Sequence, residues 1–151
     1  MNRIQVAGLS LSATALIGLA LSEGYTDTAV QPLPGDKWTI GFGTTDGVKP
    51  GDRITPPQAL ERKLRDVVKF EGAVKQCVTV PLFQYEYDAY IQLAYNIGPT
   101  NFCGATLVKK LNAQDYSGAC KEILRWNRFQ GQPNKGLTAR REREYRQCIG
   151  E

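Results

Sequence analysis

The chain contains no histidine, so any acid and base chemistry must rest on its carboxylates. Without imidazole, Ser-His-Asp and Cys-His nucleophilic schemes are excluded, as are most zinc sites built on histidine ligands. The four cysteines, Cys77, Cys103, Cys120 and Cys148, form no C-x-x-C pair, which argues against a zinc ribbon or a thioredoxin-like motif. We therefore expect neither a metal nor a cofactor.

Glu23 is the carboxylate whose sequence surroundings best suit catalysis. It follows an uncharged stretch, residues 4–21, and Gly24 comes directly after it. A helix over that stretch would set the Glu23 carboxyl against nonpolar surface. Such surroundings raise the pKa of a carboxyl and let it act as a general acid near neutral pH. The competing interpretation is a solvated or capping Glu at a helix end.

A small sheet is predicted directly after Gly24. Here Thr, Val, Tyr, Trp and Ile alternate with polar residues, and Pro34-Gly35-Asp36 is a strong turn signal. We expect strands over residues 26–32 and 37–42, with a third short strand over residues 44–49.

This hairpin carries two carboxylates that could bind a water molecule, Asp36 at the turn and Asp27 on the first strand. Turn aspartates are also common for purely local reasons, because their side chains bond nearby backbone amides. Gln31 could hold a water without being charged. Both the functional and the local interpretation of Asp36 stay open from sequence alone.

Helices are predicted for most of the remaining chain. Thr55-Pro56-Pro57-Gln58 has the features of a capping box with proline in the first turn. Downstream, apolar residues recur at three- and four-residue spacings until Gly98-Pro99 interrupts them. The expected helices cover residues 55–76, 82–97, 102–111, 116–127 and 137–149.

These elements predict one α+β domain over residues 1–151. Its parts are an N-terminal apolar helix (1–22), a sheet lobe (24–50) and a helical lobe (55–151). The predicted active-site cleft lies between the two lobes.

Several short motifs occur in an order that is typical of one enzyme family. Glu23-Gly24-Tyr25 precedes the hairpin, which contains Thr39-Ile40-Gly41-Phe42-Gly43-Thr44. The downstream motifs are Asn96-Ile97-Gly98, Phe102, Thr106-Leu107, Lys110-Leu111-Asn112, Trp126 and Gly136-Leu137-Thr138-Ala139-Arg140-Arg141-Glu142. Together they cover nearly the whole chain, which resembles the phage-type lysozymes, the endolysins of glycoside hydrolase family 24.

The resemblance implies a lysozyme fold and inverting hydrolysis of peptidoglycan, with Glu23 as the acid. In that family an Asp and a Thr on the facing hairpin hold the attacking water, and Thr39 matches the Thr. The family spacing would place the Asp near Pro32 or Leu33, which have no carboxyl. Asp36 is the nearest carboxylate in the hairpin, so Glu23, Asp36 and Thr39 are the candidate catalytic residues.

Four further residues are candidates for binding the substrate. Gly41 and Gly43 could let the strand approach a glycan, although strand glycines also mark bulges. Asn96 could bond sugar hydroxyls or cap a helix, and Trp126 could stack on a sugar or fill the core. The predicted partner is bacterial peptidoglycan.

A mild excess of positive charge, 19 Lys and Arg against 15 Asp and Glu, is compatible with several anionic polymers. The basic residues recur at helical spacing, which is typical of a solvated helix face. No motif interleaves aromatic residues with them for nucleic acid, so no nucleic-acid partner is expected. A noncatalytic peptidoglycan-binding protein on a lysozyme scaffold is the alternative to an enzyme.

The uncharged stretch, residues 4–21, has about the minimum length of a membrane span. It could be a plain first helix or an export anchor that associates transiently with a membrane. Cleavage as a signal peptide near Ala20 would leave Glu23 at a frayed terminus, which disfavours that interpretation. We expect a monomer that passes from the host cytoplasm to the periplasm or cell wall during lysis.

The even number of cysteines fits either two disulfides or buried free thiols. Four cysteines allow three pairings, and sequence does not choose among them. Our preferred prediction joins Cys77 to Cys148 and Cys103 to Cys120.

Overall fold

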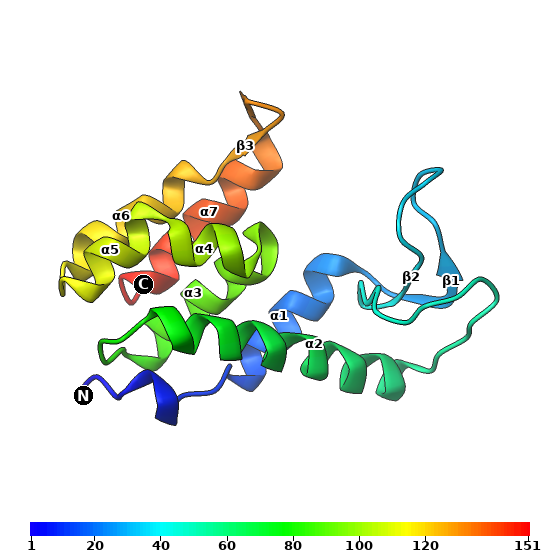
Figure 1. Cartoon of the computed structure of the whole chain (residues 1–151), viewed down its shortest axis with the longest axis horizontal. Helices are drawn as coiled ribbons and strands as arrows, with labels where there is room; N and C mark the ends of the chain where they lie inside the picture. Colours follow the sequence, from blue (N-terminus) through cyan, green and yellow to red (C-terminus); the bar gives the residue numbers. More distant parts are fainter. The chain divides into compact units, whose positions relative to one another are not determined.

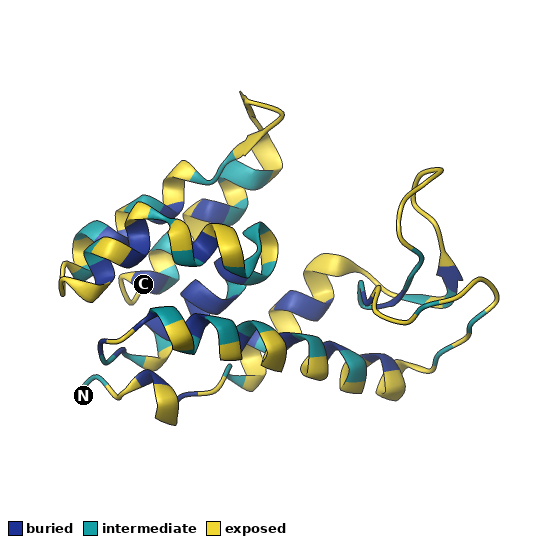
Figure 2. Cartoon of the chain, in the orientation of Figure 1, coloured by how far each residue is buried: buried dark blue, intermediate teal, exposed yellow.

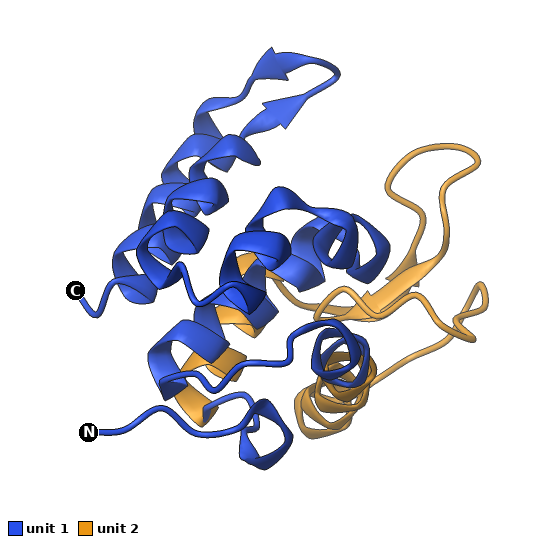
Figure 3. Cartoon of the chain, turned by 60° about the vertical axis from the view of Figure 1, so that its left-hand side comes forward, with its two compact units in different colours: residues 1–12, 70–151 blue, residues 13–69 orange.

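Seven α-helices and two small antiparallel sheets make up the computed structural model, which describes all residues 1–151. The chain forms two units, which Figure 3 shows in different colours. Unit 2 is Ala13–Lys69, and unit 1 consists of Met1–Ser12 with Phe70–Glu151. The α+β class predicted from the sequence is confirmed.

Unit 2 begins with helix α1 (Ala13–Glu23), which leads into the hairpin of strands β1 (Thr26–Val30) and β2 (Thr39–Gly41) (Figure 1). In α1 the buried residues are Ala15, Leu19 and Ala20. The helix ends before Gly24, whose φ of 72° is the left-handed conformation that glycine adopts readily after a helix C-terminus.

The hairpin is shorter than predicted. Thr26 pairs with Gly41 and Val30 pairs with Thr39, with an irregularity in register between the two pairs. Residues 31–38 form a loop, which contains Pro32 and Pro34. Proline has no N–H to donate to a sheet, so the strands end before it.

The third strand predicted over residues 44–49 is absent. Instead, Ile40 and Thr44 exchange two backbone hydrogen bonds, of 3.0 and 3.1 Å, across a tight turn. Gly41 and Gly43 have φ values of 64° and 84°, so the chain reverses here rather than extending. We call residues 40–44 the glycine turn.

Helix α2 (Pro56–Cys77) continues from unit 2 into unit 1, and it confirms the helix predicted for residues 55–76. The side-chain oxygen of Gln58 accepts a hydrogen bond of 3.0 Å from the backbone N–H of Thr55. This contact is the backbone-capping half of the predicted capping box.

Unit 1 is built around helix α3 (Gln84–Ile97), in which buried residues predominate (dark blue in Figure 2). Tyr87, Tyr90, Ile91 and Leu93 have no exposed surface. The remaining helices of this unit are α4 (Pro99–Gly104), α5 (Thr106–Asn112), α6 (Tyr116–Glu122) and α7 (Lys135–Cys148), with short 3-10 helices η1 (Val6–Gly8) and η2 (Ile123–Arg125).

Two of the predicted helices are interrupted. The helix predicted over 102–111 is split at Ala105, which has the extended backbone conformation (φ −75°, ψ 152°) between α4 and α5. The helix predicted over 116–127 ends as η2. A second hairpin, β3 (Arg128–Phe129) with β4 (Gln132–Pro133), follows it and was not predicted. Its strands are too short to show a two-residue periodicity.

The predicted disulfide pairing is wrong. Cys77 is bonded to Cys103 and Cys120 to Cys148, and each pair has a Cα–Cα distance of 5.7 Å. Cys77 ends α2 and Cys103 lies in α4, whereas Cys120 lies in α6 and Cys148 ends α7. Both distances fall within the range that a disulfide requires, and which helix ends meet that requirement depends on packing rather than on sequence spacing.

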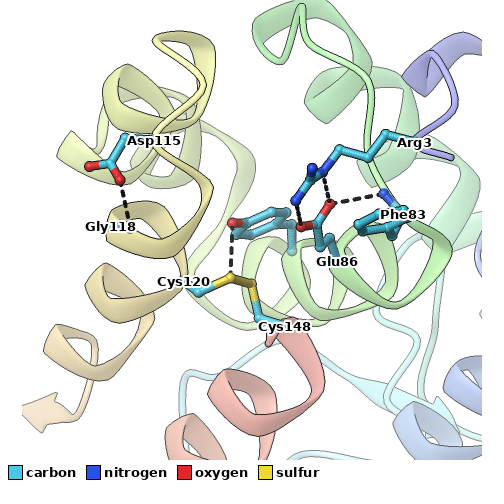
Figure 4. The surroundings of a disulfide bond; sticks show 8 residues. Arg3, Phe83, Glu86, Asp115, Gly118, Cys120 and Cys148 are labelled. Atoms are coloured by element: carbon cyan, nitrogen blue, oxygen red, sulfur yellow. Dashed lines mark hydrogen bonds and ion pairs between the residues drawn. A yellow bond between two sulfur atoms is a disulfide. The ribbon is translucent and has the colours of Figure 1, made fainter. Parts of the chain in front are cut away.

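The N-terminal residues do not form the long apolar helix that was predicted. Residues 1–12 belong to unit 1, where Ile4 and Leu82 exchange two backbone hydrogen bonds of 2.7 and 2.8 Å. Arg3 donates two hydrogen bonds, of 3.0 and 2.8 Å, to the Glu86 carboxylate (Figure 4). No helix of this structure has the length and apolar character needed to cross a membrane.

Candidate active site

Glu23 is the last residue of α1, and its side chain is exposed. Ala15, Leu19 and Glu23 lie at four-residue intervals and therefore share one face of α1. Ala15 and Leu19 are buried on this face, whereas Glu23 at its end is exposed. The nonpolar surroundings predicted for this carboxyl are therefore not found. What lies against it instead is the glycine turn.

Gly43 lies against the Glu23 carboxyl. A Cβ atom placed on Gly43 would lie 3.0 Å from Glu23 Oε2 and 3.4 Å from its carboxyl carbon. The absent side chain therefore leaves the space that the carboxyl occupies. The aromatic rings of Tyr25 and Phe42, with centroids 5.3 Å apart, join the segment after Glu23 to the same turn.

Gly41 has a different role in the structure. A Cβ on this residue would lie 2.8 Å from the Cβ of Ala59 in α2, closer than real side chains approach one another. The glycine is thus explained by close packing of the turn on the helix. Gly41 is therefore required where the turn packs on α2, and Gly43 where the turn meets the Glu23 carboxyl.

Two side chains of α2 hold the glycine turn in place, and the sequence analysis identified neither. Lys63 is fully buried and its Nζ donates a hydrogen bond of 3.0 Å to the backbone carbonyl of Phe42. The hydroxyl of Thr44 donates a hydrogen bond of 2.7 Å to Asp66 Oδ2. A signal was present, because Lys63 interrupts an apolar face of α2 that contains Ala59 and Val67 at four-residue spacing.

The hairpin residues that could position water lie on β1, on β2 and on the exposed loop between them. Asp36 is exposed, and its backbone carbonyl accepts a hydrogen bond of 2.8 Å from the Gln31 side chain. The Thr39 hydroxyl donates to the Lys37 carbonyl at 3.3 Å. Asp27 is also exposed, and its Oδ1 accepts a hydrogen bond of 3.1 Å from the neighbouring Thr28.

The two downstream candidates, Asn96 and Trp126, come together in unit 1. Asn96 lies in the last turn of α3 and Trp126 directly follows η2. Arg141 of α7 donates a hydrogen bond of 2.9 Å to Asn96 Oδ1 and one of 3.3 Å to the Trp126 carbonyl. In the sequence, Arg141 stands out only as part of the motif of residues 136–142.

Asn96 and Trp126 also line one cavity of about 530 Å³. Its other lining residues come from α3, α4, η2, the β3–β4 hairpin and α7, and they include Arg125, Arg128 and Phe129. The aromatic rings give this cavity flat apolar surface, and its amide and guanidinium groups supply hydrogen-bond donors. A neighbouring cavity of about 470 Å³ shares Asn101, Arg125 and Trp126 with it.

Comparison with known proteins assigns the chain to a family. The family model described as Phage lysozyme matches residues 20–144, a range that begins just before Glu23 and includes both the glycine turn and the motif around Arg141. The chain belongs to the phage lysozyme family. The resemblance inferred from the short motifs is thereby confirmed.

Individual members of the phage lysozyme family match over nearly their full length. The SAR-endolysin of Pseudomonas phage phiKMV is 37% identical over 153 residues, covering 99% of this chain and 93% of that protein. The solved structure of the endolysin from Escherichia coli O157:H7 phage FAHEc1 is 34% identical, with a TM-score of 0.84 and 95% of each chain covered.

A third similarity is to the muramidase domain of SpmX from Asticaccaulis excentricus, which is 27% identical with a TM-score of 0.85. It covers 94% of this chain and 99% of that domain. Together these findings confirm that the chain is a lysozyme-type glycoside hydrolase, an enzyme that hydrolyses peptidoglycan.

Proposed function

We propose that the chain cleaves the β-1,4 bond between N-acetylmuramic acid and N-acetylglucosamine in bacterial peptidoglycan, with inversion and with Glu23 as general acid. The observation that supports this most strongly is the position of Glu23 at the end of α1, with its carboxyl against Gly43 of the glycine turn. Family membership supplies the substrate class.

Glu23 protonates the oxygen of the leaving sugar. A glycoside needs such an acid because the departing alkoxide is a poor leaving group, and the chain has no histidine to serve instead. The glycine turn, held by Lys63 and Asp66, limits where the Glu23 carboxyl can lie. A carboxyl with fewer accessible positions loses less freedom in the transition state, which lowers the barrier to proton transfer.

The attacking water is held on the hairpin by Thr39, with Asp36 as the base. An inverting enzyme needs a gap of roughly 6.5–9.5 Å between its two carboxyl groups to admit this water. Asp36 is the carboxylate of the loop between β1 and β2, and its backbone is tied to Gln31. Asp27 on β1 is the competing candidate.

Substrate contacts come from Gly41 and Gly43 in unit 2 and from Asn96 and Trp126 in unit 1. In the glycine turn, the missing side chain of Gly43 keeps the surroundings of the Glu23 carboxyl open. In unit 1, the cavity lined by Asn96 and Trp126 offers an amide and an indole for the polar edges and flat faces of sugar rings.

The biological role proposed is lysis of a bacterial host by a monomeric enzyme that moves from the cytoplasm to the periplasm or cell wall. The similarity to a protein named SAR-endolysin supports an exported enzyme. Residues 4–21 are the segment that would associate transiently with a membrane during export.

The decisive experiment compares the wild type with Glu23→Gln on purified peptidoglycan, by turbidity and by release of reducing ends. A loss of about 10²–10⁴-fold with unchanged thermal unfolding is expected for a general acid. Borohydride reduction followed by mass spectrometry identifies the sugar at each new reducing end, and NMR of the fresh product gives its anomeric configuration. Activity retained in Glu23→Gln would refute the catalytic assignment.

A further inference from the structure

Arg141 is a charged side chain with no exposed surface, and its partner Glu144 is 3% exposed. Arg141 Nη2 donates a hydrogen bond of 2.9 Å to Glu144 Oε1, and its Nε lies 2.7 Å from Glu144 Oε2. Arg140 Nε adds a hydrogen bond of 3.1 Å to Oε1. The proposed reaction uses none of these three residues directly.

Such a pair is poorly explained by stability alone. Both charged forms lose solvation because the side chains are buried, and this lowers the pKa of Arg141 and raises that of Glu144. Buried ion pairs often contribute no more than apolar side chains of similar volume. The geometry of the remaining nitrogen of Arg141 indicates what else the pair does.

That nitrogen, Nη1, binds the two candidate substrate residues of unit 1. It donates to Asn96 Oδ1 at 2.9 Å and to the Trp126 backbone carbonyl at 3.3 Å. Glu144 holds the opposite edge of the same planar guanidinium. One rigid group therefore joins the end of α3 to the residue that follows η2.

The contact also decides which end of the Asn96 amide faces outward. An arginine can only donate hydrogen bonds, so it must bind the oxygen of the amide and not its nitrogen. Asn96 Nδ2, with its two N–H groups, is then directed away from Arg141. Asn96 is exposed and lines the cavity beside Trp126, and its Nδ2 forms no hydrogen bond within the chain.

We propose that Arg141, held by Glu144, is a positioning residue that presents the Asn96 N–H groups to a carbonyl oxygen of the substrate. This inference rests on the proposed function and adds the chemistry that the unit 1 cavity recognises. A carbonyl of this kind occurs in the acetamido groups of the glycan and in the peptides attached to it. Asn96 is the residue that touches the substrate, and Arg141 acts by holding the Asn96 side chain.

Three variants test the proposal, each first checked by thermal unfolding. Asn96→Asp keeps an oxygen for Arg141 but has no N–H to present, and Asn96→Ala removes the side chain. Arg141→Lys keeps the charge but lacks the second and third nitrogens. The control is Arg143→Lys on the same helix, because Arg143 is exposed and forms no ion pair in the structure.

Loss of one neutral hydrogen bond to substrate raises KM about fivefold, so Asn96→Asp and Arg141→Lys should each do so with little change in kcat. In the Asn96→Ala background, Arg141→Lys should raise KM much less, because only its hydrogen bond to the Trp126 carbonyl is then left to lose, although it still lowers the midpoint of unfolding. Equal effects of Arg141→Lys in both backgrounds, or an unchanged KM in Asn96→Asp, would overturn the proposal.

A binding experiment separates this inference from the cleavage reaction. Calorimetric titration of a Glu23→Gln protein uses three probes: an N-acetylglucosamine oligomer, its deacetylated counterpart, and peptide-bearing peptidoglycan fragments. If Asn96→Asp abolishes the preference for the acetylated oligomer, the carbonyl is the acetamido oxygen. If it abolishes only the preference for peptide-bearing fragments, the carbonyl belongs to the peptide.

These two results both support presentation of the Asn96 N–H groups. The inference is refuted if the Glu23→Gln proteins with and without Asn96→Asp bind all three probes with equal affinity. Because the titration requires binding and no cleavage, it decides the inference even if the wild type releases no reducing ends. A wild type that releases no reducing ends would refute the proposed function and leave the inference to be judged by the titration.

Discussion

The carboxyl of Glu23 lies against Gly43, where a Cβ atom would come within 3.0 Å of Glu23 Oε2. The end of α1 and the glycine turn are thus fitted to each other at a residue without a side chain. The residue that contacts the carboxyl of the proposed acid here is a glycine and not a second charged residue.

Gly43→Ala should therefore impair activity beyond its effect on stability. Its φ of 84° would strain an alanine by about 1–2 kcal/mol, and Glu23 Oε2 would have to shift by a few tenths of an ångström to admit the new methyl group. The control is Gly47→Ala, where φ is 69° but nothing lies within 4 Å of the added Cβ. Both variants should lose similar stability in urea unfolding, and Gly43→Ala alone should lose much of its kcat. Equal kcat losses in the two would contradict the fit.

Asp36→Asn should reduce kcat about 10²–10⁴-fold if Asp36 is the general base, whereas Asp27→Asn should leave it close to the wild-type value. The wild-type rate should fall at both low and high pH, because the acid must be protonated and the base ionised. Asp36→Asn should lose the fall at low pH. A null effect of both substitutions would leave Thr39 and Gln31 as the groups that hold the water.

The Glu122 carboxylate should stabilise the folded chain near neutral pH, and this stabilisation should disappear at low pH. Its hydrogen bond from Lys110, together with Arg125, lowers the pKa of Glu122 below the ordinary value of 4.5. Because the folded-state pKa is lowered, the stabilisation is present above pH 4.5 and disappears as the pH falls through the folded-state pKa.

Glu122→Gln should then cost about 0.5 kcal/mol of unfolding free energy at pH 7 and almost nothing at low pH, as measured by urea unfolding. Glu142→Gln is the matched control, since Glu142 is exposed on α7 and forms no ion pair in the structure. A Glu122→Gln deficit that persists at low pH would mean that its cause is not the carboxylate charge.

The disulfides should be found between Cys77 and Cys103 and between Cys120 and Cys148 when peptides of the unreduced protein are mapped by mass spectrometry. The second bond closes 28 residues of chain, so replacing both of its cysteines by serine should lower the unfolding free energy by about 3–4 kcal/mol in the chain-entropy model. A peptide linking Cys77 to Cys148 would contradict the structure.

Part of this protein could be predicted because the signals are local. The extent of α2 follows from its capping residues and its periodicity, and Gln58 does accept from the Thr55 N–H as the motif predicts. The motifs around Glu23 and Thr39 are local too, and they indicate the family without knowledge of the fold. Capping and periodicity act over a few residues, which is why sequence alone determined them.

Local signals of this kind do not predict contacts between segments that are distant in the sequence. The uncharged stretch of residues 4–21 has one composition throughout, yet Ile4 in its first part pairs with Leu82, while α1 begins only at Ala13. Nothing periodic distinguishes the two parts, because the backbone partners lie far away in sequence. The predicted disulfide pairing is wrong for the same reason.

Sequence by itself determined the lysozyme family, the absence of histidine chemistry and the proposed acid at Glu23. Only the tertiary structure decided that Gly41 packs on Ala59, that Gly43 faces the Glu23 carboxyl, and that Arg141 donates a hydrogen bond to Asn96 Oδ1. Residue types limit which chemistry a chain can perform. Which of those groups meet depends on packing between elements that are remote in sequence, and that packing is a property of the folded chain as a whole.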